Sequence, residues 1–217
     1  DGGGAAGSNK MVEVFPEAIV NGNVISGGYV RLRSQATVNG LARAADSVVL
    51  HAGAVVTGVE EGASVAIVDI PQKNTIITGT EKITVSNGSN RILSPGYYND
   101  LTVESSCTLT VSGGLYTFSR FFLQPDAIVL LDIAYSDMVD IEVSGDLEFS
   151  DRSKVIFKDK GYVPFIRFYT NDANMVRVGV MVELNGTLTA PHGEIHIFSG
   201  SQCEGAVYGK TVYIEPD

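Results

Sequence analysis

The chain has 217 residues, of which 44% are hydrophobic and 18% are charged, and its formal net charge is −10. This acidic balance argues against nucleic acid or an anionic membrane surface as a partner, because both attract Lys and Arg. No apolar run approaches the ~20 residues that cross a bilayer, so no membrane insertion is expected. Val, Ile, Gly, Ser and Thr are abundant, which is typical of β-structure.

Residues 1–10 come first and include the run DGGGAAGSN. We expect a flexible leader here, either a mature N-terminus left by processing or a disordered start. On the first interpretation the protein is exported and its leader peptide has been removed.

Residues 11–68 repeat a short apolar phrase every 18 residues. Residues 30–32 (VRL) return as 48–50 (VVL), and residues 36–40 (ATVNG) return as 54–58 (AVVTG). Apolar and polar residues alternate within each phrase, which is strand periodicity, and the closing Gly suits a turn. A strand, a turn and a strand at fixed period are typical of a parallel β-solenoid with coils about 4.8 Å apart. An antiparallel sandwich with coincidental spacing is the alternative.

This register predicts which side chains stack inside the coils. The larger residues form one internal ladder, Val20, Val38 and Val56. The small residues form another ladder in a narrow corner, Ala18, Ala36 and Ala54.

Residues 69–80 interrupt the period, and Pro71 cannot donate to a strand ladder. We expect a linker or a strap along the side of the solenoid. Residues 81–217 resume the alternation with less regular coils, since NGTLTAPHGEIHI is echoed by EGAVYGKTVYI at offsets of 19 and 17 residues. Residues 158–177 fit no period and predict an irregular insertion that leaves the solenoid wall.

Two motifs carry a resemblance to exported bacterial surface proteins. ILSPGYYNDLTVESSCTLTVSGGLYTF resembles their LSPGTY and LTLSGGLYVF motif, and GAVYGKTVYI resembles their closing GAVxGKxVxI motif. The first 70 residues are similar to the polymer-forming repeats of bactofilins. The resemblance implies a right-handed, exported β-solenoid of adhesin-like or pilus-associated type, and it does not include residues 158–177.

The sequence HGEIH is a candidate metal site. His192, Glu194 and His196 share one face of the expected strand, because side chains alternate along a strand. Two imidazoles and a carboxylate suit Zn²⁺. We favour the competing interpretation, a solvated outward rung with Ile195 and Ile197 pointing inward, and expect neither a metal nor a cofactor.

Residues 137–151 are an acidic run with the carboxylates Asp137, Asp140, Glu142, Asp146, Glu148 and Asp151. Clustered carboxylates suit Ca²⁺, and a pair at defined separation can hydrolyse polysaccharides. The run has neither EF-hand spacing nor a contiguous Asp-Asp pair. A solvated acidic face is therefore the favoured interpretation, and we expect no enzyme.

The aromatic residues of the insertion form the last candidate site: Tyr162, Phe165, Phe168 and Tyr169. They are interpreted as a binding patch for sugar or protein, or alternatively as a flap that covers the solenoid wall. Cys107 is in phase with inward Leu109, so we expect a buried thiol there. Cys203 lies in the turn-like SGSQCEG, and a disulfide between coils or subunits is the alternative to free thiols.

These features together predict an all-β chain of about 10 coils and about 50 Å, with a structural role. We expect a subunit or display element of an extracellular bacterial surface structure. We also expect a homopolymer joined through its terminal coils, because no helical cap covers MVEVF or VYIEPD. The alternatives are a glycan- or protein-binding adhesin module and a polysaccharide-acting β-helix enzyme.

Overall fold

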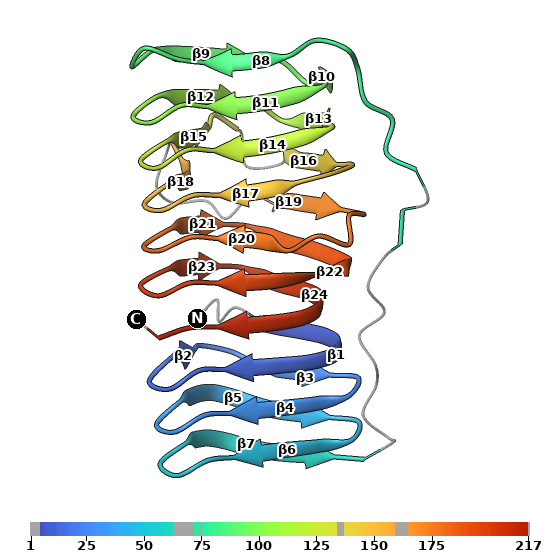
Figure 1. The fold of residues 1–217 in the computed structure, drawn as a ribbon, viewed down its shortest axis with the longest axis vertical. Helices are drawn as coiled ribbons and strands as arrows, with labels where there is room; N and C mark the ends of the chain where they lie inside the picture. The colour runs from blue at the N-terminus through green and yellow to red at the C-terminus, as the bar shows by residue number, and fades with distance from the viewer. Residues whose placement is uncertain (1–4, 63–71, 74, 134–136, 159–164, 217) are drawn as a thin grey trace.

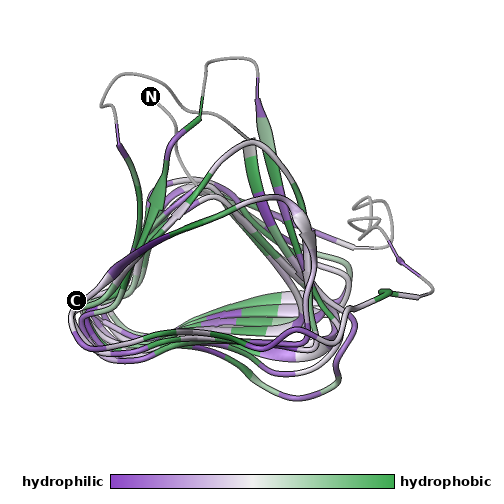
Figure 2. Ribbon diagram, turned by 90° about the horizontal axis from the view of Figure 1, so that it is seen from above, coloured by the Kyte–Doolittle hydropathy of each residue, from purple (hydrophilic) through white to green (hydrophobic). Residues whose placement is uncertain are grey.

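The structure is a computed structural model that describes residues 5–62, 72–73, 75–133, 137–158 and 165–216. These residues form strands and turns and contain no helix, so none of them crosses a membrane as a helix. Paired strands in the described part of the chain run parallel, and the coils stack along one long axis (Figure 1). Seen along that axis the coils outline a triangle (Figure 2). The prediction of an all-β, parallel chain is confirmed.

Three faces make up this triangle, and we name them A, B and C by their strands. Face A holds ten described strands or strand halves. In stacking order from the upper end of Figure 1 they are β8 (Ile83–Val85), β11 (Asp100–Val103), β14 (Arg120–Leu123), β17 (Leu147–Phe149), β20 (Val176–Val178), the second halves of β22 (Thr187–Ile197), β24 (Ala206–Ile214) and β1 (Ala5–Val14), then β4 (Tyr29–Leu32) and β6 (Ser47–Leu50).

Face B stacks in the same order and shares the long strands with face A. Its strands are β10 (Gly96–Tyr97), β13 (Gly114–Phe118), β16 (Met138–Val143), β19 (Phe165–Thr170), the first halves of β22, β24 and β1, β3 (Val24–Ser26), and the ends of β5 (Thr37–Ala44) and β7 (Val55–Glu61).

Face C is divided into two parts. Its upper part is a separate six-stranded sheet. The members are β9 (Asn90–Leu93), β12 (Thr108–Val111), β15 (Ile128–Leu131), β18 (Lys154–Phe157), β21 (Glu183–Asn185) and β23 (Gln202–Glu204). Its lower part holds β2 (Ile19–Val20) and the starts of β5 and β7.

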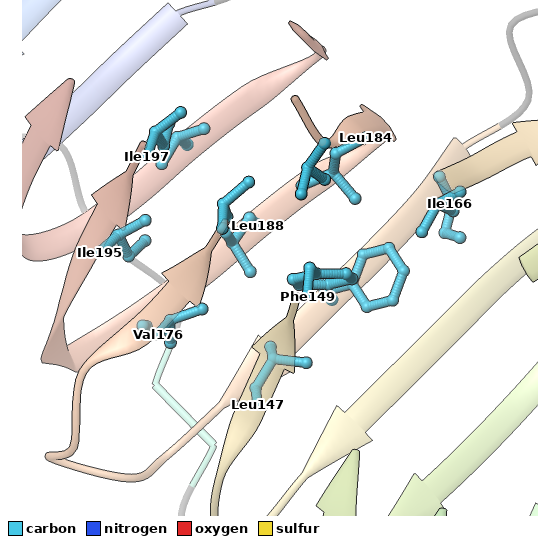
Figure 3. Packing of buried hydrophobic residues seen from close by; sticks show 14 of the residues in the cluster. Leu147, Phe149, Ile166, Val176, Leu184, Leu188, Ile195 and Ile197 are labelled. Carbon is cyan, nitrogen blue, oxygen red and sulfur yellow. The ribbon is translucent and has the colours of Figure 1, made fainter. Parts of the chain in front are cut away.

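The alternation of inward and outward residues along each strand determines which side chains fill the triangle. Apolar residues at every second position point inward, and those of neighbouring rungs pack on one another (Figure 3). Val38 pairs with Val20 above it and Val56 below it, and its exposed fraction is 1%. The 18-residue register predicted for this ladder is confirmed. Burying a Val, Leu or Ile contributes roughly 1.5–3 kcal/mol, so the stacked ladders dominate the stability.

The corner between faces A and C repeats one tight turn. Gln35 has a φ of 62°, and the N–H of Ala36 donates to the carbonyl of Arg33 at 3.1 Å. A positive φ at the third turn position defines a type II turn, which usually takes Gly there. The next residue points inward at the narrow corner, where Ala18 and Ala36 are 0–1% exposed, as predicted for the small-residue ladder, whereas Ala54 in the end coil is half-buried.

Ser153 occupies the same corner higher in the stack. Its exposed fraction is 0%, and among the described residues its Oγ has no hydrogen-bond partner. An unsatisfied buried hydroxyl destabilises by roughly 1–3 kcal/mol. We therefore expect Ser153→Ala to raise the free energy of unfolding by about 1 kcal/mol in urea titrations. Ser105→Ala, at an exposed turn position, serves as the control, and an unchanged or lower midpoint for Ser153→Ala would contradict the expectation.

The order of stacking differs from the order of the sequence. β1 pairs in parallel with β24 over Ala5–Ala206 to Val14–Ile214, so the first coils lie below the last. The prediction of unpaired rows at MVEVF and VYIEPD is wrong, because these two strands satisfy each other. The ends of the stack are instead the coil with β8 and β9 and the coil with β6 and β7 (Figure 1).

Two further boundaries need correction. The expected leader, residues 1–10, is wrong for its second half, because β1 begins at Ala5 and both Ala6 and Ser8 are buried. The expected insertion, residues 158–177, is wrong where it is described. There β19 and β20 take their places in faces B and A, and residues 159–164 lie outside the described part.

Candidate functional site

The HGEIH segment lies in the second half of β22, on face A. His192 and Glu194 are exposed, His196 is half-buried, and Ile195 and Ile197 point into the core. A register shift between Ala190 and Glu194 separates His192 from the regular rungs. The arrangement agrees with the outward rung that the sequence analysis favoured.

His196 makes its contacts along the stack. Its Nε2 lies 3.0 Å from Glu215 Oε1, and its ring stacks on Phe198 at a centroid distance of 4.1 Å. Tyr213, one rung below, lies 5.5 Å away, and Phe15, beyond the β24–β1 boundary, lies 6.4 Å away. The imidazole is thus part of an aromatic ladder that crosses the junction between the last and first coils. Within the described residues no three His, Cys, Asp or Glu side chains group as metal ligands.

Carboxylates of the acidic run pair with basic and amide side chains from other parts of the chain. Arg167 donates to both carboxylate oxygens of Asp140, at 2.6 and 2.7 Å. Lys73 forms an ion pair with Glu142, and Asn174 donates to Asp146 at 3.0 Å. These contacts occupy the carboxylates in holding rungs together, which is a structural role. These contacts could not be predicted from the sequence, because Arg167, Asn174 and Lys73 lie 27, 28 and 69 residues away from their partners.

Asp151 shows the electrostatic effect of such pairing. The Arg177 guanidinium, 2.8 Å away, and the Val180 N–H, 3.0 Å away, hold the pKa of this carboxyl below its usual value. A carboxyl with a lowered pKa in the folded state stabilises the fold above about pH 4, and this contribution is lost as the pH falls through the folded pKa.

We expect Asp151→Asn to lower the free energy of unfolding at pH 7 by no more than about 1 kcal/mol, because the pair is partly exposed and screened. The difference from wild type should shrink when denaturant titrations are repeated at successively lower pH below about 4, because the carboxyl is protonated first in the unfolded state and then in the folded state. A difference that stays constant with pH would show that Asp151 acts through packing instead.

The aromatic segment is not a surface patch where the structure describes it. Phe168 is 0% exposed and lies edge-on to Phe149 and Phe121 at centroid distances of 5.1 and 5.8 Å. Tyr169 is 6% exposed. The backbone of Phe165 pairs with Met138 in the sheet, and Tyr162 lies outside the described residues. Phe168 and Tyr169 are therefore core and wall residues, because they are closed off from any ligand.

Tyr169 instead anchors the chain at Lys73, and residues 72–73 and 75–80 lie beside the stack. Its hydroxyl accepts the N–H of Lys73 at 2.7 Å, and Asn171 donates to the Lys73 carbonyl. The Lys73 ammonium sits 5.4 Å from the ring centroid of Tyr169. Further along, the N–H of Gly79 donates to the Tyr98 carbonyl at 3.0 Å. Of the linker or strap predicted for residues 69–80, the described residues lie beside the stack as a strap does, and residues 69–71 and 74 lie outside the described part.

The two cysteines are free thiols in different surroundings. Cys107 belongs to the small-residue corner ladder and is 0% exposed, as its phase with Leu109 predicted. Cys203 is half-buried at the lower edge of β23, and burial raises the pKa of its thiol to about 12.

The described side chains of the candidate sites are thus engaged in contacts between rungs and with residues beside the stack. The chain matches no protein-family model, and no similar curated protein or solved structure was found. The likeness to exported bacterial surface proteins rests on the sequence motifs alone.

Proposed function

We propose that the chain is a β-solenoid, right-handed as its resemblance implies, that serves as a structural subunit or display element of an extracellular bacterial structure. The observation that supports this best is the unbroken stack of ten parallel rungs on face A, which joins both parts of the chain through β24 and β1. At about 4.8 Å per rung the stack is a rod about 45 Å long.

The lower end of the rod is suited to contact another copy. Leu50 and Val59 occupy inward positions there but are 45% and 43% exposed, whereas Leu32 and Ala42 one rung above are 0% exposed. Adding a further rung would bury this apolar surface and pair the strand edges of β6 and β7 that have no strand partner among the described residues.

The upper end differs in chemistry. Ile83 and Val85 are each 1% exposed, although they belong to the last described rung. Arg91 is in register with inward Leu109 and lies 3.5 Å from Glu81. Glu61, on face B of the lower end, is in register with buried Ala44 and accepts the N–H of Val48. Because the two ends differ in apolar exposure, contact of a lower end with an upper end is heterologous and continues as an open filament.

Analytical ultracentrifugation and electron microscopy of the purified chain test this assembly. We expect concentration-dependent association into filaments for wild type and its loss for Leu50→Lys, which places a charge in the contact. Val49→Lys, at the adjacent outward position, should assemble as wild type does. A wild-type monomer at every concentration would contradict the assembly.

Export has a separate test. On intact cells that make the protein, a membrane-impermeant amine reagent should label its lysines. Labelling seen only after cell lysis would contradict a surface location while leaving the assembly result unaffected.

The outer surface of face C supports a second candidate, an adhesin module that binds glycan or protein. Four side chains stack there in a flat outward ladder, Ile92, Thr110, Leu130 and Ile156. Ile92 is 79% exposed. Pull-down on insoluble polysaccharides, with Leu130→Asp as the loss variant, tests this candidate, and equal retention of both proteins would reject it.

A further inference from the structure

The outer surface of face A carries a group of aromatic rings where the last coils meet the first (Figure 1). We name it the seam cluster, and its members come from three consecutive rungs: His196 and Phe198 from that of β22, Tyr213 from that of β24 and Phe15 from that of β1. All four rings are half-buried. The cluster is complete only when β1 pairs with β24, because Phe15 comes from the other side of this pairing.

The rings of the seam cluster lie close together and are inclined to one another. The centroid of Tyr213 is 5.5 Å from that of His196 and 6.3 Å from that of Phe15, at interplanar angles of 46° and 64°. Phe198 supports His196, on which it stacks at 4.1 Å. Inclined rings that border one area of the surface can act together on a single ligand, and a cation is attracted to the face of each ring.

Carboxylates lie beside these rings. Burial and then the carboxylates of Glu194 and Glu13 raise the pKa of the Tyr213 hydroxyl, in agreement with a negative local field. Glu13 is already paired with Arg31 and Arg33. Glu194 is exposed and has no basic partner within the described part of the chain, so its charge is available to a ligand.

We propose that the seam cluster binds a quaternary ammonium group, of the kind that choline carries, with its methyl groups against the rings and its charge beside Glu194. Aromatic rings attract such a cation through their electron-rich faces. An anionic ligand would be repelled by Glu194, and an uncharged apolar ligand would gain nothing from it. The site lies on the side of the rod and does not depend on assembly through the rod ends.

Chemical-shift titration of the isotope-labelled chain with choline tests the site. The matched ligand is 3,3-dimethylbutanol, which has the same shape but a carbon atom in place of the charged nitrogen. We expect saturable shifts at Phe15, His196 and Tyr213, a dissociation constant for choline in the millimolar range, and at least tenfold weaker binding of 3,3-dimethylbutanol. Equal binding of the two ligands would overturn the proposal, and so would the absence of saturable shifts at these residues.

Variants separate the contribution of the rings from that of the charge. Tyr213→Phe should retain the affinity for choline, whereas Tyr213→Leu should lower it at least tenfold, because it keeps an apolar side chain and removes the π-system. Glu194→Gln should lower it about threefold, whereas Glu204→Gln, which removes an exposed carboxylate on face C, should leave it unchanged. Equal losses for the Glu194 and Glu204 variants would show that only the net charge of the chain matters, which contradicts the site. Glu194 is exposed, so this comparison remains decisive if Tyr213→Leu fails to fold.

Two carriers present this group, a soluble choline compound and a lipid headgroup. Phosphocholine coupled to a soluble carrier and vesicles of phosphatidylcholine distinguish them. Retention on the carrier alone identifies a soluble ligand, whereas sedimentation with the vesicles identifies a lipid. Failure of the wild-type chain to bind either would contradict a role for the seam cluster in recognising the group.

Discussion

Val38→Asp is expected to unfold the lower coils, from β1 to β7. The carboxylate would lie between Val20 and Val56 in a ladder where Val38 is 1% exposed, and no cation faces that position in the described core. An uncompensated buried charge destabilises by about 3–5 kcal/mol, and the lost Val contact adds to this. That sum is comparable with the whole stability of many domains.

The measurement is far-ultraviolet circular dichroism combined with limited proteolysis. New cleavage within residues 11–58 is expected for Val38→Asp and not for Thr37→Asp, whose side chain points outward in the same strand. If both variants resist protease as wild type does, the assignment of inward and outward positions in β5 is wrong.

Phe168→Ala is expected to lower the free energy of unfolding by about 3–5 kcal/mol, because it removes a fully buried ring. The ring touches Phe121 and Phe149 on two neighbouring strands, so the cavity lies between faces A and B. Urea titration gives the value from the shift in midpoint.

Arg167→Ala is the matched control, since Arg167 is the outward neighbour of Phe168 and pairs with Asp140 at the surface. Surface ion pairs contribute about 0–1 kcal/mol, so only a small shift is expected there. If Phe168→Ala left the stability unchanged but abolished binding to a glycan, the result would contradict a core role for Phe168 and support its interpretation as part of a binding patch.

The regular part of the fold could be predicted because its coils have constant length. From Val12 to Val56 equivalent residues recur every 18 positions, so inward and outward sides can be read from local alternation. The upper coils could not be aligned in this way. Asp140 and Arg167 lie side by side but are 27 residues apart, whereas Ile195 and Val212 are separated by 17. A pattern of fixed period misplaces rungs of such different length, which is why residues 165–170 were taken for an insertion.

The pairing of the first strand with the last could not be predicted from local sequence either. The pairing of β1 with β24 joins residues about 200 positions apart. The backbone edge of one parallel strand offers the same hydrogen-bonding groups as that of another, so the sequence does not indicate which two edges pair. The contacts of the candidate residues could not be predicted for a related reason. His196 and the acidic run look like ligands when only their own segment is considered, but their partners, Glu215, Arg167 and Arg177, come from other rungs. Some tight turns could not be predicted either, because Gln35 and Met181 occupy turn positions with positive φ where Gly is usual.

The pairing of β1 with β24 also implies a delay during synthesis between the appearance of a strand and that of its partner. The strand that begins at Ala5 leaves the ribosome about 200 residues before its partner at Ala206 exists. At 5–20 residues per second the nascent lower coils wait roughly 10–40 s with one edge open. During that interval the exposed row of N–H and C=O groups is free to pair with other nascent chains. Co-translational folding of this protein therefore depends on keeping that edge apart from competitors until the last strand is made.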